Sequence, residues 1–83
     1  PKLCLYLKNI LFQNNSNDEI ILEIQEQFNL AKLIIFDSKG RILRKEDINS
    51  KTNRIETADL PPGIYFLNLT SSSLFANFKI VKP

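Results

Sequence analysis

Short apolar runs alternate with polar turn segments along the whole chain. Clusters rich in Asn, Ser, Asp, Gly and Pro interrupt the runs every 8–12 residues or so, which is roughly the spacing of strands joined by tight turns. This pattern predicts an all-β fold, an antiparallel β-sandwich of about seven strands. The runs that we interpret as strands or strand candidates lie at residues 3–7, 10–12, 19–25, 32–36, 41–46, 54–57, 64–70 and 74–83.

The last two runs show the clearest alternation of faces. Tyr65, Leu67 and Leu69 share one face of the first run, and Ala76, Phe78 and Ile80 share one face of the second, so we predict that these faces point into the core. The opposite faces carry Ile64, Phe66, Asn68 and Thr70 in the first run and Phe75, Asn77, Lys79 and Val81 in the second. The apolar members of this second set are either covered by other strands or form a docking surface on the last hairpin.

Residues 19–28 can be read in two ways. As a strand, residues 19–25 place Ile20, Leu22 and Ile24 on one face. Helical spacing also fits, and Glu, Gln and Leu are good helix formers. Periodicity alone does not separate strand from helix here, and we predict a strand because the neighbouring segments have clear β character. The residues that fit the helical spacing are Ile20, Ile24, Phe28, Ala31 and Ile35.

Two turns carry glycine where the chain must bend sharply. Residues 37–40 read Asp-Ser-Lys-Gly, a hairpin turn in which Gly40 can take a positive φ without steric cost. Residues 59–63 read Asp-Leu-Pro-Pro-Gly, a rigid bend in which Gly63 is expected to supply a second position of this kind. Residues 13–18 and 47–53 are predicted loops, because Asn, Ser and Asp hydrogen-bond to their own backbone in turns.

A chain of 83 residues makes a single domain, expected to cover residues 1–83, with residues 1–8 either a linker or the first strand. The chain begins with Pro and contains no Met, which indicates an excised domain or a processed fragment. No apolar run approaches the roughly 20 residues of a membrane helix.

The charge balance is weak. The net charge is +2, from 11 basic and 9 acidic residues, which argues against nucleic acid as a partner. Residues 39–54 contain six basic residues against Glu46 and Asp47. This stretch is either a patch for an acidic partner, such as an anionic polysaccharide, or a charged hairpin kept soluble by lysines that discourage edge pairing; we favour the second interpretation.

The residue types argue against catalysis. There is no His, and the single Cys4 excludes an intramolecular disulfide, so Ser-His and Cys-His schemes are not available. We interpret Cys4 as a small, partly buried apolar residue. Two glycines are too few for a phosphate-binding loop, and no segment has the spacing of a calcium site. We therefore expect no enzymatic activity, no cofactor and no metal.

Four motifs in order resemble the C-terminal sorting domains of the Bacteroidetes type IX secretion system (type A, Por secretion tail). Phe12 and Asn14 stand where the family opens with Tyr-Pro-Asn-Pro, and both prolines are replaced here. Phe36-Asp-Ser-Lys-Gly40 matches the aromatic-Asp-x-x-Gly turn, and Leu60-Pro-Pro-Gly-Ile-Tyr65 matches the Leu-Pro-x-Gly-x-Tyr hairpin. Lys79 and Lys82 match the basic residues of the last strand. The resemblance covers about residues 11–83.

This resemblance implies an immunoglobulin-like sandwich that acts as a secretion signal for an upstream cargo in the same parent chain. The implied partners are the outer-membrane translocon, its shuttle protein and a cell-surface sortase. The implied route leads through the periplasm to the outer-membrane surface or the medium. The residues that match the sorting motif are Gly40, Leu60, Pro61, Gly63, Tyr65, Lys79 and Lys82.

Two other functions remain open from the sequence. One is an immunoglobulin-like carbohydrate-binding or adhesive accessory module, and the other is a purely structural tail of an enzyme. A glycan-binding module favours exposed aromatics, yet the chain has no Trp and most of its Phe residues fit a strand core. If the last strand lies at a sheet edge, it offers β-augmentation to a partner strand, and an edge-strand homodimer is a further candidate.

Overall fold

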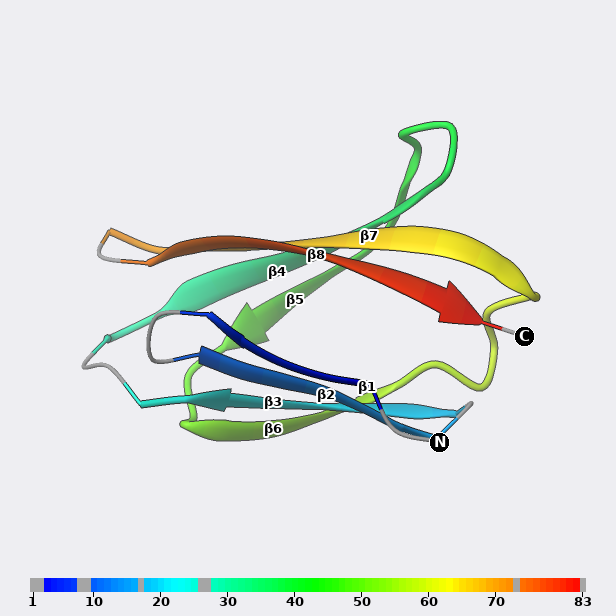
Figure 1. Cartoon of the computed structure of the whole chain (residues 1–83). Helices are drawn as coiled ribbons and strands as arrows, with labels where there is room; N and C mark the ends of the chain where they lie inside the picture. Colours follow the sequence, from blue (N-terminus) through cyan, green and yellow to red (C-terminus); the bar gives the residue numbers. More distant parts are fainter. Residues whose placement is uncertain (1–2, 8–9, 17, 26–27, 73, 83) are drawn as a thin grey trace. The chain divides into compact units, whose positions relative to one another are not determined.

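The computed structural model describes residues 3–7, 10–16, 18–25, 28–72 and 74–82, and these form eight strands in two four-stranded antiparallel sheets (Figure 1). The first sheet has the order β1-β2-β3-β6, and the second has the order β5-β4-β7-β8. Each sheet belongs to a separate compact unit of the chain. The all-β prediction is therefore confirmed. None of the described segments is a helix of the length and apolarity needed to cross a membrane.

The first sheet contains β1 (Leu3–Leu7), β2 (Ile10–Ser16), β3 (Glu19–Ile24) and β6 (Thr52–Glu56). In β3, Ile20, Leu22 and Ile24 are buried while the residues between them are only half-buried, as strand alternation predicts. The helical alternative for this segment is wrong. Because β3 is hydrogen-bonded to β2 on one side and to β6 on the other, both edges of its backbone are satisfied by neighbouring strands.

The predicted loop at 13–18 is wrong over most of its length. β2 continues to Ser16, where Gln13 lies opposite Ile21 and Asn14 lies opposite Ile20. The register shifts between Asn14 and Ser16. The polar segment therefore forms a β-bulge within the strand, and β2 does not end there. Cross-strand hydrogen bonds to β3 outweigh the local turn preference of the Asn and Ser residues.

The second sheet contains β4 (Ala31–Asp37), β5 (Ile42–Ile48), β7 (Gly63–Thr70) and β8 (Phe75–Lys82). Two hairpins, β4–β5 and β7–β8, are joined side by side through the pairing of β4 with β7. The predicted alternation is confirmed in both strands of the last hairpin. The buried side chains there are Tyr65, Leu67, Leu69, Ala76, Phe78 and Ile80.

The predicted loop at 47–53 is longer than the real one. β5 continues through Ile48, which lies opposite Ala31 and is buried, and β6 already begins at Thr52. Burial of Ile48 and the ladder to β4 extend the strand beyond the point where polar residues predict its end. Ile55 of β6 is also buried.

Candidate recognition surface

The bend that leads into β7 combines a short turn with a glycine of unusual conformation. The backbone N–H of Leu60 donates to the carbonyl oxygen of Thr57 at 3.0 Å, and Pro61 and Pro62 follow at exposed positions. Gly63 then starts β7 with φ of +154°, which side chains of L residues rarely adopt. The glycine is thus placed where the backbone requires one.

Four of the seven residues that match the sorting motif lie on one hairpin. Gly63 lies opposite Lys82, and Tyr65 lies opposite Ile80. In the next cross-strand pair, Phe66 lies opposite Lys79. Tyr65 is buried, and a Cβ at Gly63 would lie 4.0 Å from both Cε2 and the hydroxyl oxygen of its ring. The tyrosine ring therefore packs beside the glycine at the start of β7.

Gly40 closes the β4–β5 turn of the same sheet. Its N–H donates to the carbonyl oxygen of Asp37 at 3.0 Å, and its φ is +85° with open space around a hypothetical Cβ. The predicted hairpin turn is confirmed. Leu60, which is half-buried, and Pro61, which is exposed, belong to the bend before β7.

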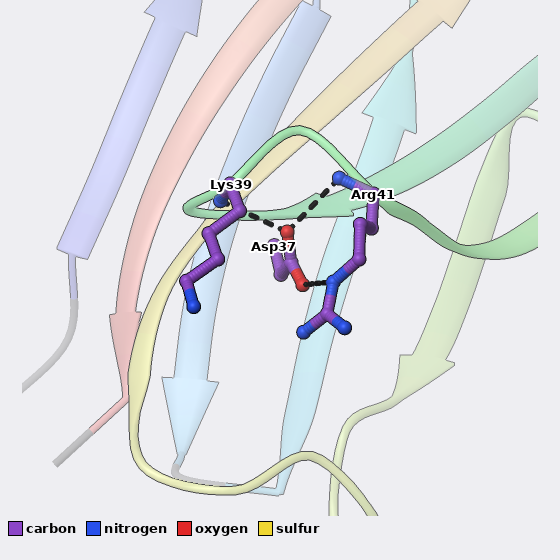
Figure 2. Close-up of polar contacts among 3 residues, drawn as sticks. All are labelled: Asp37, Lys39 and Arg41. Carbon is purple, nitrogen blue, oxygen red and sulfur yellow. Dashed lines mark hydrogen bonds and ion pairs between the residues drawn. The ribbon is translucent and has the colours of Figure 1, made fainter.

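The Asp37 carboxylate organises the β4–β5 turn, as Figure 2 shows. Its Oδ1 accepts hydrogen bonds from the backbone N–H groups of Lys39 and Arg41, both at 2.9 Å, and its Oδ2 accepts from Nε of Arg41 at 2.7 Å. These donors hold the pKa of Asp37 below its ordinary value, and the backbone N–H of Arg41 is the main cause. Such a network stabilises the turn.

The basic run at 39–54 is divided between two strands of different sheets, and three of its basic side chains are paired with carboxylates. Arg41 pairs with Asp37, Arg44 with Glu46 at 3.2 Å, and Arg54 with Glu19 at 3.0 Å. Arg54 belongs to β6 of the first sheet, whereas Arg44 belongs to β5 of the second. The run is divided between two sheets, and Arg41, Arg44 and Arg54 are paired with carboxylates. Both observations favour the interpretation as a charged, soluble hairpin over a site for a polyanion.

The outer face of the second sheet carries several exposed apolar side chains. Ile64, Phe66, Phe75 and Val81, the apolar residues predicted on the non-core faces, are 40, 42, 70 and 56% exposed. They are thus open to solvent, which agrees with the docking-surface interpretation and contradicts cover by other strands. Between them, Nδ2 of Asn68 on β7 donates to Oδ1 of Asn77 on β8 at 2.8 Å.

Ile42 and Leu43 extend this exposed surface and were not predicted. Ile42 lies opposite Phe36, which in turn lies opposite Phe66 and then Lys79, so one row crosses all four strands. A bulge between Ile35 and Phe36 shifts the pairing with β5 here and leaves both Ile42 and Leu43 exposed. No local sequence signal marks the bulge, so their exposure could not be predicted.

β8 is also an edge. It pairs with β7 over its whole length, and no other described strand is hydrogen-bonded to its far side. Lys79 is exposed and Lys82 half-buried, and both lie on this strand. A long edge strand whose outer face carries Phe75, Lys79 and Val81 offers both main-chain and side-chain contacts to a partner.

Nothing in the described part of the chain gathers three or more His, Cys, Asp or Glu side chains in the manner of a metal site. The side chain of Cys4, and with it the interpretation of that residue, lies outside the described residues. The apolar face and edge of the β7–β8 hairpin are the candidate recognition surface.

Comparison with known proteins agrees with the motifs and the fold. The family model described as "Secretion system C-terminal sorting domain" matches residues 11–83. A search of curated proteins found no match. Among solved structures, a DUF3244 family protein from Bacteroides vulgatus with an immunoglobulin-like β-sandwich fold is similar, with 20% sequence identity, 100% of each chain covered and a TM-score of 0.85. At this identity the similarity shows the fold alone, and it confirms the immunoglobulin-like sandwich.

Proposed function

Because this chain belongs to the family of secretion system C-terminal sorting domains, which are signals for type IX secretion, we propose that its β7–β8 hairpin is the part of the signal that the secretion machinery recognises. The domain directs the protein that carries it to the cell surface or to the outside. Neither the family nor the immunoglobulin-like fold is an enzymatic one.

The observation that carries the proposal is the concentration of motif residues on a single exposed edge hairpin. Gly63 and Tyr65 shape its start, whereas Lys79 and Lys82 lie on its edge strand. Gly40 supports the sheet from the neighbouring hairpin, and Leu60 with Pro61 sets the bend before it. In this division of roles, the glycines, the bend and the tyrosine are positioning residues, and the lysines contact the partner.

The partners follow from the same assignment. The translocon and its shuttle protein bind the folded domain in the periplasm, by pairing a strand with the β8 edge and by placing acidic groups opposite its lysines. A surface sortase then acts on the exported chain. The domain itself performs no reaction, and the cargo lies upstream in the parent chain.

A reporter fusion tests the proposal. The domain is joined to the C-terminus of a secreted reporter in a host with a type IX system, and Lys79 and Lys82 are changed to Ala, singly and together. Exposed Lys45 on β5 of the same sheet serves as the matched control. We expect the double variant to retain the reporter inside the cell while its melting temperature is unchanged, and Lys45→Ala to be exported normally.

Normal surface delivery of the folded double variant would show that the secretion machinery does not recognise the lysines of β8. Loss of both folding and export would instead assign them a structural role. A deletion of Lys82 and Pro83 provides a second test, since it shortens the edge strand without altering the buried face of the hairpin, whose last buried residue is Ile80.

The carbohydrate-binding alternative has one observation in its favour. Phe66 and Phe75, which flank the Asn68–Asn77 amide pair along the hairpin, are both exposed, and aromatic rings beside amides suit sugars. Binding of the isolated domain to a glycan array, lost in Phe66→Ala and Phe75→Ala variants that are still exported, would add this function to the sorting role.

A further inference from the structure

β8 combines an unpaired edge with two strongly exposed apolar side chains. The strand lies at the end of its sheet with its far edge unpaired among the described strands, and such an edge is a template for another strand. Phe75 and Val81, near the two ends of the same strand, are 70 and 56% exposed, the highest values among the large apolar side chains of the described chain. An occupant of the edge should therefore also cover both of these side chains.

A second copy of the chain can both pair with the β8 edge and cover Phe75 and Val81, if the two copies are related by a two-fold axis. A two-fold axis perpendicular to the sheet can join two β8 edges in antiparallel fashion, and it places one residue opposite the same residue of the partner. Since β8 spans Phe75–Lys82, only an axis at Phe78 or at Lys79 pairs nearly the whole strand. An axis at Lys79 is disfavoured by charge, because it sets two lysines directly opposite each other.

The axis at Phe78 gives a chemically matched register. Phe75 then lies opposite the partner's Val81, so the two exposed apolar positions cover each other on the outer face. Asn77 lies opposite the partner's Lys79 on the same face. On the core face, Ala76 lies opposite the partner's Ile80, and Phe78 lies opposite itself; all three of these residues are buried in the single chain. No charged residue faces a like charge directly.

We propose that the chain forms a two-fold homodimer by antiparallel pairing of its β8 strands about Phe78. The two four-stranded sheets become one continuous sheet with two copies of the order β5-β4-β7-β8. The two Lys79 side chains stand diagonally across the seam, at about 7–8 Å between their Cα atoms, which is within the Debye length of about 10 Å at 0.1 M salt. The dimer is therefore weakened by this repulsion and tightens as salt rises.

The consequence of the dimer rests on the proposed function. The edge that joins two copies is the one offered to the secretion machinery, so self-association and recognition exclude each other. A monomer presents the signal, and a dimer withholds it. Dilution, or competition by a partner with a better-matched strand, releases the edge.

Charge changes at Asn77 test the register by sedimentation equilibrium of the purified 83-residue chain over a range of concentrations. Asn77→Asp places a carboxylate opposite each partner's Lys79 and keeps an oxygen for the hydrogen bond from Asn68. We expect it to lower the dimer Kd by a factor of about 2–30, from two cross-strand pairs of opposite charge. Asn77→Lys should raise the Kd by a similar factor, and Asn77→Lys with Lys79→Asp should restore dimerisation.

The control variants introduce the same charge changes at Thr70 on β7, one strand away from the β8–β8 interface. Thr70 is exposed on the same face of β7, opposite Phe75 of the same chain, so Thr70→Asp and Thr70→Lys should leave the dimer Kd within about twofold. Circular dichroism of every variant at low concentration confirms that the monomer is folded. A chain that stays monomeric at millimolar concentration and high salt overturns the proposal, as does a dimer that responds equally to Asn77 and Thr70 changes.

Export of the reporter fusion separates this inference from the proposed function. If Asn77→Asp tightens the dimer and reduces export while Thr70→Asp does neither, self-association withholds the signal as proposed. Normal export of a strongly dimeric Asn77→Asp variant would overturn the withholding. Normal export of the Lys79 and Lys82 double variant would overturn the recognition role of β8, while the sedimentation results would still decide the dimer.

Discussion

Replacing Gly63 with Ala tests whether the start of β7 needs a conformation that only glycine adopts easily. The φ of Gly63 is +154°, and an added Cβ would meet only the Tyr65 ring, at 4.0 Å, which is ordinary van der Waals contact. The cost is therefore one of backbone strain, about 1–3 kcal/mol. The smaller entropy of the unfolded Ala chain offsets about 0.4–1 kcal/mol of this.

The net loss is about 0–2.6 kcal/mol, centred near 1.3 kcal/mol, and the central value is large for a chain of this size. Domains of 60–100 residues lose roughly 4–8 °C in melting temperature per kcal/mol, so the central value predicts that Gly63→Ala melts about 5–10 °C lower. Thermal unfolding followed by circular dichroism measures the difference. The experiment is performed at a concentration at which the wild-type chain is monomeric, so that self-association does not contribute.

Gly40 provides the matched comparison. Its φ of +85° lies near the left-handed region that Asn tolerates, and there is open space around it. Gly40→Asn should therefore recover part of the stability that Gly40→Ala loses, whereas Gly63→Asn should be no better than Gly63→Ala. A melting temperature of Gly63→Ala within about 1 °C of wild type, or a clear rescue by Asn at 63, would refute the reasoning.

Three further predictions concern a turn, the core and the outer face. The pKa of Asp37 is lowered in the folded chain, so its contribution is fully present above its unfolded pKa, near 3.8, and is lost as the pH falls through the lower folded value. Asp37→Asn should therefore flatten this acid limb of the stability profile in urea titrations at several pH values, and identical profiles would contradict the role of the turn. Tyr65→Ala should cost about 3–5 kcal/mol in urea unfolding because the ring is buried, and a loss below about 1 kcal/mol would place the ring elsewhere. Phe75→Ser should change the stability of the dilute monomer by less than about 0.5 kcal/mol because the ring is 70% exposed, and a loss above about 2 kcal/mol would mean that the ring is packed.

Much of the second sheet could be predicted from local pattern. Strict alternation in residues 64–70 and 75–81 identifies the buried faces of β7 and β8, because successive side chains of a strand point to opposite sides. The turn at 37–40 could be predicted as well, since Asp and Gly supply its hydrogen bonds and its positive φ within a few residues.

Features that depend on distant partners could not be predicted in this way. Residues 13–16 look like a loop and are part of β2 because β3 supplies their ladder, and residues 19–24 are a strand because β6, some 30 residues later, completes the second edge of β3. The candidate site shows the same division. Its residues could be listed from motifs, but the exposure of Ile42 depends on a bulge between β4 and β5.

The strand periodicity, the glycine turns and the family can be derived from the amino-acid sequence, since each of these is encoded in neighbouring residues or in a short ordered set of motifs. The folded structure was needed to show that the basic run is divided between two sheets, that β8 is an edge strand, and that its outer face is open to solvent. The physical reason is that hydrogen-bond pairing between strands is a long-range property. The residues of a strand show which of its faces is apolar, but they do not show which strand will pair with it.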